Sequence, residues 1–219
     1  MPSTKLWLSA LLLGGCITLH NLTAWSEDSV STGTASPIDR VVAAKLMTGY
    51  PDGQFHAEAG LSRAELASII VKVFDVDKRK LPDPSTIEVT DVPTTHWAYP
   101  AIQQVLKNKV MQGYRNHRFF PNQKVTRAEG FAILAQAYGV FSFEDKVVDE
   151  ILTPYSDAYQ IPAWARKALA TGLHEGFVNT QKAGDFDKIS PLRPLNRGDV
   201  AYALAKYLDR QEGVKPANP

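Results

Sequence analysis

Apolar residues recur at helical spacing in three segments of the chain. The members of each set follow the i, i+3, i+4, i+7 pattern of one helix face: Leu66, Ile69, Ile70, Val73; Phe131, Leu134, Ala135, Tyr138; Val200, Ala203, Leu204, Tyr207. Another helix is predicted before each of them, at about residues 38–48, 97–112 and 163–175. No convincing alternating strand run appears, so the pattern predicts helices throughout.

These segments belong to an internal repeat. Gly49-Tyr50 recurs 64 positions later as Gly113-Tyr114, and the box Ser62-Arg63-Ala64-Glu65 recurs at the same offset as Thr126-Arg127-Ala128-Glu129. A third, divergent copy is predicted from Gly176-Phe177 and the box Asn196-Arg197-Gly198-Asp199. The glycine-to-arginine spacing is 14 in the first two copies and 21 in the third, which predicts an insertion within residues 179–194.

Each copy is predicted to fold as a helix, a glycine-ended turn, a loop and a second helix. Gly49, Gly113 and Gly176 stand where a left-handed helix C-cap is expected. No helix pair can bury its apolar face alone, so three pairs should share one core. We therefore predict an all-α fold of three tandem helix-loop-helix repeats packed as a pseudo-threefold bundle.

The first residues have the pattern of an export signal. Lys5 precedes the apolar run from Leu6 to Leu13, which is too short to span a bilayer. Two cleavage sites stay open: a lipoprotein signal ending at residue 15, which would leave Cys16 as a lipidated N-terminus, and ordinary cleavage after residue 24. Both predict an exported protein of the cell envelope.

The remaining boundaries follow from composition and from the repeat. Residues 25–36 are polar and are predicted to form a flexible linker. Copy 1 is predicted at 37–80, lacking the start of the unit, copy 2 at 81–145, and copy 3 at 146–212. Residues 213–219 are predicted to form a disordered tail.

Charge and composition exclude several functions. The chain has 24 Lys+Arg against 23 Asp+Glu, so it carries no general basic field for nucleic acid. The single cysteine excludes an internal disulfide, and the five histidines show no metal-binding spacing. No nucleophile motif is found either. We predict a protein that is not an enzyme and has no cofactor and no metal.

Helix capping explains the first and last residues of the box but not its arginine. Its first and last residues fit a helix capping box in copies 1 and 2, with a weaker version in copy 3. The arginine in the second position faces the positive end of the helix dipole, which costs about 0.3–1 kcal/mol. Two interpretations stay open: the arginines bind an anion together with free helix-start amides, or they pair with an acid of another copy.

Copies 2 and 3 also share an opening. Asp91 and Trp97 begin copy 2, and Asp157 and Trp164 begin copy 3. The aspartates are suited to helix caps. The tryptophans are suited either to core packing or to stacking on a sugar ring beside polar groups.

Residues 91–129 resemble the S-layer homology (SLH) motif in the order Asp, His-Trp-Ala, Gly-Tyr, Phe, Phe-Pro, Val-Thr-Arg-Ala-Glu. Copy 1 matches from Gly49 through Glu65 without the leading Asp and Trp, and copy 3 matches more loosely. The resemblance covers about residues 37–210. It implies three SLH motifs that anchor a protein non-covalently to cell-wall polysaccharide attached to peptidoglycan, often with pyruvate ketals that carry a carboxylate.

The same resemblance assigns candidate ligand-binding residues, with one or two working grooves expected. The first groove has Arg127 with Asp91, Trp97, Gly113 and Tyr114, the second Arg63 with Gly49 and Tyr50, and the third Arg197 with Asp157 and Trp164. The alternative function is an envelope adaptor or lipoprotein tether that binds an outer-membrane or other envelope protein.

Overall fold

The computed structural model describes residues 35–79, 85–139 and 143–213. These residues belong to a compact unit that begins at Ala35. The predicted leader with Cys16, most of the predicted linker and residues 214–219 of the predicted tail lie outside the described residues.

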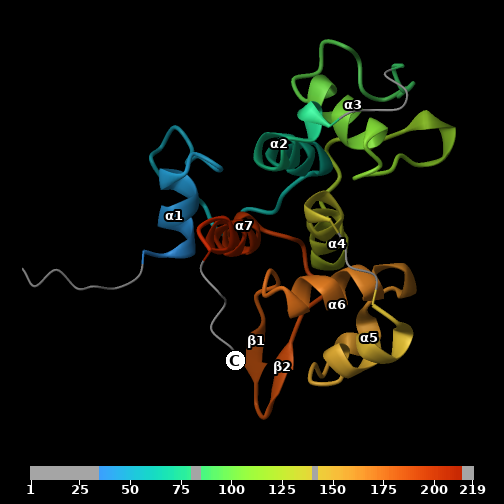
Figure 1. The fold of residues 1–219 in the computed structure, drawn as a ribbon. Coiled ribbons are helices and arrows are strands. Elements are labelled where there is room, and N and C mark those ends of the chain that lie inside the picture. The colour runs from blue at the N-terminus through green and yellow to red at the C-terminus, as the bar shows by residue number, and fades with distance from the viewer. Residues whose placement is uncertain (1–34, 80–84, 140–142, 214–219) are drawn as a thin grey trace, which may run out of the picture. The chain divides into compact units, whose positions relative to one another are not determined.

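Most elements of the described chain are helices (Figure 1). The α-helices are α1 (Pro37–Ala43), α2 (Arg63–Phe74), α3 (Tyr99–Lys107), α4 (Arg127–Tyr138), α5 (Asp145–Leu152), α6 (Arg166–His174) and α7 (Arg197–Gln211). Four short 3-10 helices lie between them: Val76–Lys78, Arg115–His117, Ala158–Gln160 and Ala163–Ala165. One antiparallel hairpin joins β1 (Gln181–Ala183) to β2 (Phe186–Lys188).

The three copies are joined by a closed ring of backbone hydrogen bonds. The residue before each box is buried and extended, and each bonds to the next one. Val125 N donates to Leu61 O at 3.1 Å, Leu195 N to Val125 O at 2.8 Å, and Leu61 N to Leu195 O at 2.9 Å. A ring of three equivalent bonds is the signature of the predicted pseudo-threefold arrangement.

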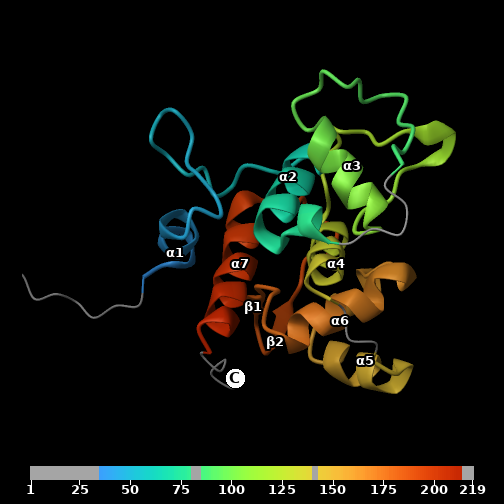
Figure 2. The same ribbon diagram turned by 45° about the horizontal axis from the view of Figure 1, so that its top comes forward.

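Helix packing follows the same cycle. The second helix of each copy contacts the first helix of the next, pairing α2 with α3, α4 with α6 and α7 with α1 (Figures 1 and 2). An ion pair between Arg40 Nη1 on α1 and Asp209 Oδ1 on α7, 2.5 Å apart, ties the last copy to the first. The predicted all-α class is confirmed, with the small hairpin as an addition that the sequence pattern did not reveal.

The predicted glycine caps are only partly correct. Gly176 has the left-handed backbone (φ 73°), but the equivalent positions after α1 and α3 are Lys45 (φ 57°) and Lys109 (φ 55°). Gly49 and Gly113 instead permit a close backbone approach. A Cβ on Gly113 would lie 3.2 Å from Arg118 O, which accepts a 2.7 Å hydrogen bond from Tyr114 N.

The register of copy 3 also differs from the prediction. Because Gly176 matches Lys109, the pair equivalent to Gly113-Tyr114 is Thr180-Gln181 and not Gly176-Phe177. The glycine position is then 17 residues before Arg197 (197 − 180), against 14 in copies 1 and 2. The insertion is therefore three residues long, and it lies in the segment that contains the β1–β2 hairpin.

Candidate functional site

The capping boxes form in all three copies, as predicted. In copy 1, Ser62 Oγ accepts from Glu65 N at 3.3 Å and Glu65 Oε2 accepts from Ser62 N at 2.7 Å. Thr126 with Glu129, and Asn196 with Asp199, make the same reciprocal pair. The third box, predicted to be weaker, has the full geometry.

The next two helix-start amides are also paired, which removes a premise of the anion-receptor interpretation. Arg127 N donates to Arg193 O at 2.8 Å, and Ala128 N donates to Pro191 O at 2.9 Å. The first two amides of α2 and α7 make the equivalent bonds to loop carbonyls of copies 2 and 1. The helix starts are therefore joints between copies and present no free row of N–H groups to a ligand.

Arg127 lies in the joint between copies 2 and 3, with 2% of its surface exposed. Its Nη1 is 2.5 Å from Asp199 Oδ1, and its Nε donates to Ile189 O at 2.7 Å. Asn179 takes the remaining bonds through its side-chain and backbone oxygens. The expectation of an open guanidinium is thus corrected in favour of the alternative, pairing with an acid of another copy.

Burial dominates the electrostatics of this arginine. Desolvation is the largest influence and lowers the pKa of Arg127. The Asp199 carboxylate raises this pKa and the neighbouring Arg193 lowers it, and the net result is a pKa of about 10. Arg127 therefore stays protonated at neutral pH, and its charge is compensated by a carboxylate that is itself only 2% exposed.

Arg63 and Arg197 occupy the equivalent joints. Arg63 Nε donates to Phe119 O and its Nη2 to Gln112 O, both at 2.7 Å. Arg197 Nε donates to Phe55 O at 2.9 Å, and its Nη2 donates to Thr48 O. Each box arginine thus binds the loop of the next copy.

The cyclic pairing changes the predicted grooves. Tyr114 packs on Arg63, whose Cζ is 4.9 Å from the ring centroid, and Tyr50 packs on Arg197 at 4.8 Å. The sequence resemblance groups Tyr114 with Arg127, Tyr50 with Arg63, and Arg197 with residues of copy 3. These three groupings are wrong because each arginine reaches forward into the following copy.

The two aspartates hold loops in place. Asp91 accepts from Phe119 N and Phe120 N, both at 2.8 Å. Asp157 accepts from Ile189 N at 2.9 Å and Ser190 N at 2.8 Å, and is 6% exposed. Their observed bonds organise the loop before each box rather than cap a helix.

The tryptophans are the most exposed of the predicted site residues. Trp97 is 63% exposed and Trp164 is 64% exposed, although the alanines that follow them, Ala98 and Ala165, are buried. The ring of His96 stacks on Trp97 with centroids 5.6 Å apart. Tyr50 and Tyr114 remain partly exposed as well. The core-packing interpretation of the tryptophans is wrong.

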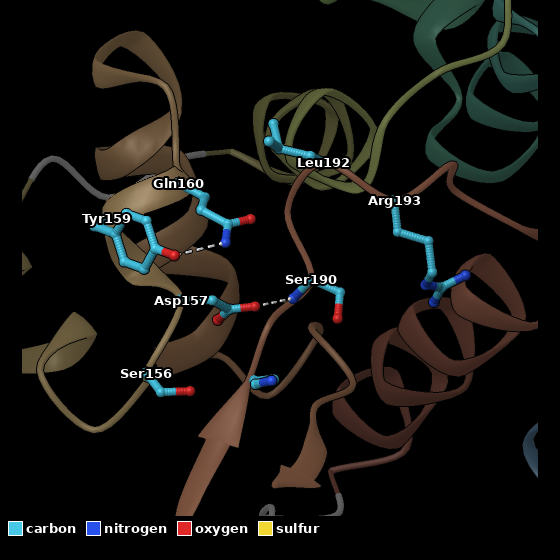
Figure 3. A pocket seen from close by; sticks show the side chains of 8 residues that line it. Ser156, Asp157, Tyr159, Gln160, Ser190, Leu192 and Arg193 are labelled. Carbon is cyan, nitrogen blue, oxygen red and sulfur yellow. Dashed lines mark hydrogen bonds between the residues drawn. The ribbon is translucent and has the colours of Figure 1, made fainter.

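Three grooves border the joints. One of about 500 Å³ lies in copy 3 between the 156–160 turn and the 188–193 loop (Figure 3). A second of about 420 Å³ runs beside Asn179, Arg193 and Asp199 to the start of α1. A third of about 160 Å³ lies beside Thr48 and Arg197.

Sequence reasoning missed several residues that shape these grooves. Arg193 donates to both oxygens of Asp199 through Nη2, at 2.9 and 3.0 Å, and borders the two larger grooves. Asn179 completes the bonds of Arg127, and Tyr159 is 80% exposed. Arg193 can be matched to its place beside Arg127 only when the extra residues of the β1–β2 hairpin are included in the alignment of the copies.

The described residues contain neither a metal-binding cluster nor a membrane-spanning helix. Across residues 35–79, 85–139 and 143–213, no group of three or more His, Cys, Asp or Glu side chains is arranged to hold a metal ion. No helix in these ranges has the length and apolar content needed to cross a membrane.

Comparison with known proteins identifies part of the repeat. The S-layer homology domain model matches two segments of this chain, residues 28–67 and 90–129. These matches lie over copies 1 and 2, and the first begins nine residues before the predicted start of copy 1 (37 − 28).

Several relatives have surface-layer or anchoring names. The Surface-layer 125 kDa protein of Lysinibacillus sphaericus is 24% identical over 85% of this chain and 15% of the relative. The Cellulosome-anchoring protein of Acetivibrio thermocellus is 27% identical over 76% of the chain and 36% of the relative. S-layer protein EA1 of Bacillus anthracis is 25% identical over 87% of the chain and 20% of the relative. The matched region thus spans between 15% and 36% of these relatives' lengths.

Proposed function

We propose that this chain is a non-catalytic anchoring module of the cell envelope that binds polysaccharide attached to peptidoglycan. The SLH matches in copies 1 and 2 and the relatives that carry surface-layer and anchoring names support this class of function. Copy 3, which repeats the box bonds and the joint, serves as the third SLH motif. The protein acts outside the cytoplasm.

The observation that carries the proposal is the exposure of Trp97 and Trp164. Two indoles at equivalent positions of two copies each leave about two thirds of their surface in solvent. An exposed indole contributes little to folding, whereas its flat face suits the face of a pyranose ring. The repetition indicates that the two rings share a binding role.

The polar part of the proposed site changes with the structure. The box arginines act as positioning residues. Arg63 and Arg127 hold the loops that follow the tryptophan and the first helix in copies 2 and 3. Arg197 holds the corresponding loop in copy 1, which has no such tryptophan. Asp91, Gly113 and Tyr114 shape the loop in copy 2, Gly49 and Tyr50 the loop in copy 1, and Asp157 the loop in copy 3. Sugar contact is assigned to the exposed rings.

Co-sedimentation with purified wall sacculi tests the proposal. The chain from residue 25 onward should sediment with sacculi and should lose most of its binding when the attached polysaccharide is chemically stripped. Replacing Trp97 and Trp164 together with alanine should reduce binding at least tenfold and leave the helical circular dichroism unchanged. The matched control is Phe186→Ala, an aromatic residue that is 57% exposed on the hairpin.

The control distinguishes the outcomes. Equal binding by the double variant and the Phe186 variant would refute the assigned role of the tryptophans. Binding that survives stripping would favour peptidoglycan itself or an adaptor that docks another envelope protein. A lipidated Cys16, detected by mass spectrometry of the native N-terminus, would make the module a tether between membrane and wall.

A further inference from the structure

The groove of about 500 Å³ in copy 3 shares only Asp157 with the residues assigned above. Figure 3 shows it between the turn that carries Asp157 and Tyr159 and the loop that carries Ser190, Leu192 and Arg193. Of the three residues predicted for a site in copy 3, Asp157 lines this groove, whereas Trp164 and Arg197 do not. Its lining comes mostly from positions at which copy 3 departs from the other two copies.

One departure removes an aromatic pair. In copy 2, Phe120 and Tyr114 pack edge to face with centroids 5.2 Å apart, and in copy 1 His56 and Tyr50 do so at 5.1 Å. Ser190 has the same positive backbone angle (φ 53°) and the same bond to Asp157 that Phe120 makes to Asp91. Copy 3 therefore has a hydroxyl where copy 2 has a phenyl ring, and the surface is hollow there.

The second departure is an excess of positive charge. The buried carboxylate of Asp199 is shared by two guanidinium groups, those of Arg127 and Arg193, so this cluster retains one net positive charge. Arg193 Nε has no hydrogen-bond partner among the described residues. At the equivalent positions, copy 2 has Gln123 and copy 1 has Ala59, and neither is charged.

Lys188 adds a second cation to the groove. It belongs to β2, lines the groove and forms no ion pair within the described ranges. The one acid in the lining, Asp157, already accepts two backbone hydrogen bonds through its two oxygens. Lys188 and the arginine cluster together carry two net positive charges against the one negative charge of Asp157, so the groove keeps an excess of positive charge.

Apolar surface lies beside these charges. Tyr159 is 80% exposed and Leu192 is 56% exposed, and both line the groove. Tyr159 Oη accepts a 3.1 Å bond from Gln160 Nε2, which holds the two side chains together. A flat exposed ring beside uncompensated cations suits a ligand that has both a ring face and an anionic group.

We propose that this groove is a separate binding site for an acidic sugar, with Lys188 and Arg193 receiving its carboxylate or phosphate and Tyr159 contacting the sugar ring. The inference rests on the proposed function, because it takes the ligand to be a wall glycan. It adds a site specific to copy 3, formed by residues outside the box and outside the Gly-Tyr position.

Three monosaccharides that share one ring test the site: glucuronate, glucose 6-phosphate and glucose. Two-dimensional amide NMR of the chain from residue 25 onward should show saturable shifts at Tyr159, Lys188 and Ser190 with one or both acidic sugars, and none with glucose. The two acidic probes determine whether the site prefers a carboxylate or a phosphate. Added salt should weaken the binding, because part of the attraction is screened.

A charge variant with a matched control makes the test specific. Lys188→Gln should weaken binding of the acidic sugar about fivefold or more, as expected for loss of one charge-assisted contact. Lys182 lies on the same hairpin, pairs with Asp187 and does not line the groove. Lys182→Gln should therefore leave the affinity for the acidic sugar unchanged. Equal shifts with glucose, or equal affinity in the two lysine variants, would overturn the site.

The outcome separates this inference from the proposed function. A chain that sediments with sacculi but shows no shift with either acidic sugar retains the anchoring function and loses this site. A chain that binds acidic sugars through Lys188 but does not sediment retains the site and loses the anchoring function.

Discussion

The joint between copies 1 and 2 and the joint between copies 2 and 3 share one backbone plan but differ in charge. In both, the box arginine is buried and its Nε donates to a carbonyl of the next copy. Arg63 otherwise meets a second carbonyl and the rings of Tyr114 and Phe119. Arg127 meets the carboxylate of Asp199.

The difference arises from the third box. Asp199 is one methylene shorter than Glu129, yet it still closes its capping box, and its other oxygen faces Arg127 and Arg193. Glu129 acts on Arg63 only through its electrostatic field, while burial lowers the pKa of Arg63. One fold position therefore serves as a joint in which the arginine bonds to carbonyl oxygens in one place and as an ion-paired joint in another.

The ion-paired joint should be the more sensitive to loss of its arginine. Arg127→Met leaves the buried Asp199 carboxylate with Arg193 as its remaining cation, and it also removes the donors to Ile189 O and to Asn179. Together these losses should lower the free energy of unfolding by about 3–5 kcal/mol. Urea unfolding followed by circular dichroism measures the loss. The exposed Arg118→Met is the control, with a change below about 0.5 kcal/mol. A loss below 1 kcal/mol for Arg127→Met would show that the ion pair does not hold the joint.

The hydrogen-bonding joint should lose less. Arg63→Met removes the donors from Phe119 O and Gln112 O without leaving a carboxylate buried, so we expect a loss of about 1–3 kcal/mol. The same unfolding assay applies. Equal losses for the two arginines would mean that the shared carbonyl bonds, and not the charge, determine the strength of both joints.

Packing at the second joint provides a third comparison. A Cβ on Gly130 would lie 2.4 Å from Leu195 Cδ2, so Gly130→Ala forces the leucine to move. Overpacking should outweigh the helix-propensity gain and cost a net amount of about 1 kcal/mol. Gly198→Ala is the matched control, because its Cβ would make only 3.4 Å contacts with Ala57. If Gly130→Ala stabilises the protein as much as Gly198→Ala, the joint is looser than described.

The fold was largely predictable because its signals are local. Helical periodicity and the capping boxes depend on residues within a few positions, and a constant offset of 64 revealed the copies. The copy that each box arginine contacts was not predictable. Arg127 bonds to Asp199, which is 72 positions away, and no residue near Arg127 in the sequence indicates which copy its side chain reaches. The groove of copy 3 was not predicted for a related reason. Gly176 was aligned with Gly113, so the register of copy 3 was wrong and the equivalent positions of Arg193 and Ser190 were not recognised.

The smallest expected effect concerns the third joint, where Arg197 and Lys124 lie near Glu65. Burial by itself raises the pKa of Glu65, but hydrogen bonds from the Ser62 backbone and hydroxyl, with the two cations, lower it below its ordinary value of 4.5. The folded pKa is therefore below the unfolded one. This stabilisation is complete above pH 4.5 and is lost as the pH falls through the folded pKa.

Glu65→Gln should consequently cost under about 1 kcal/mol at pH 7, since the side chain is partly exposed and screened. The difference from wild type should vanish as the pH falls below 4, because protonation then removes the same charge from the wild-type side chain. Urea midpoints measured between pH 3 and pH 7 give the profile, with Glu88→Gln at an exposed position as the matched control. A pH-independent cost would mean that shape, and not charge, accounts for the role of Glu65, and would leave the Arg127–Asp199 joint as the one where a carboxylate's charge matters.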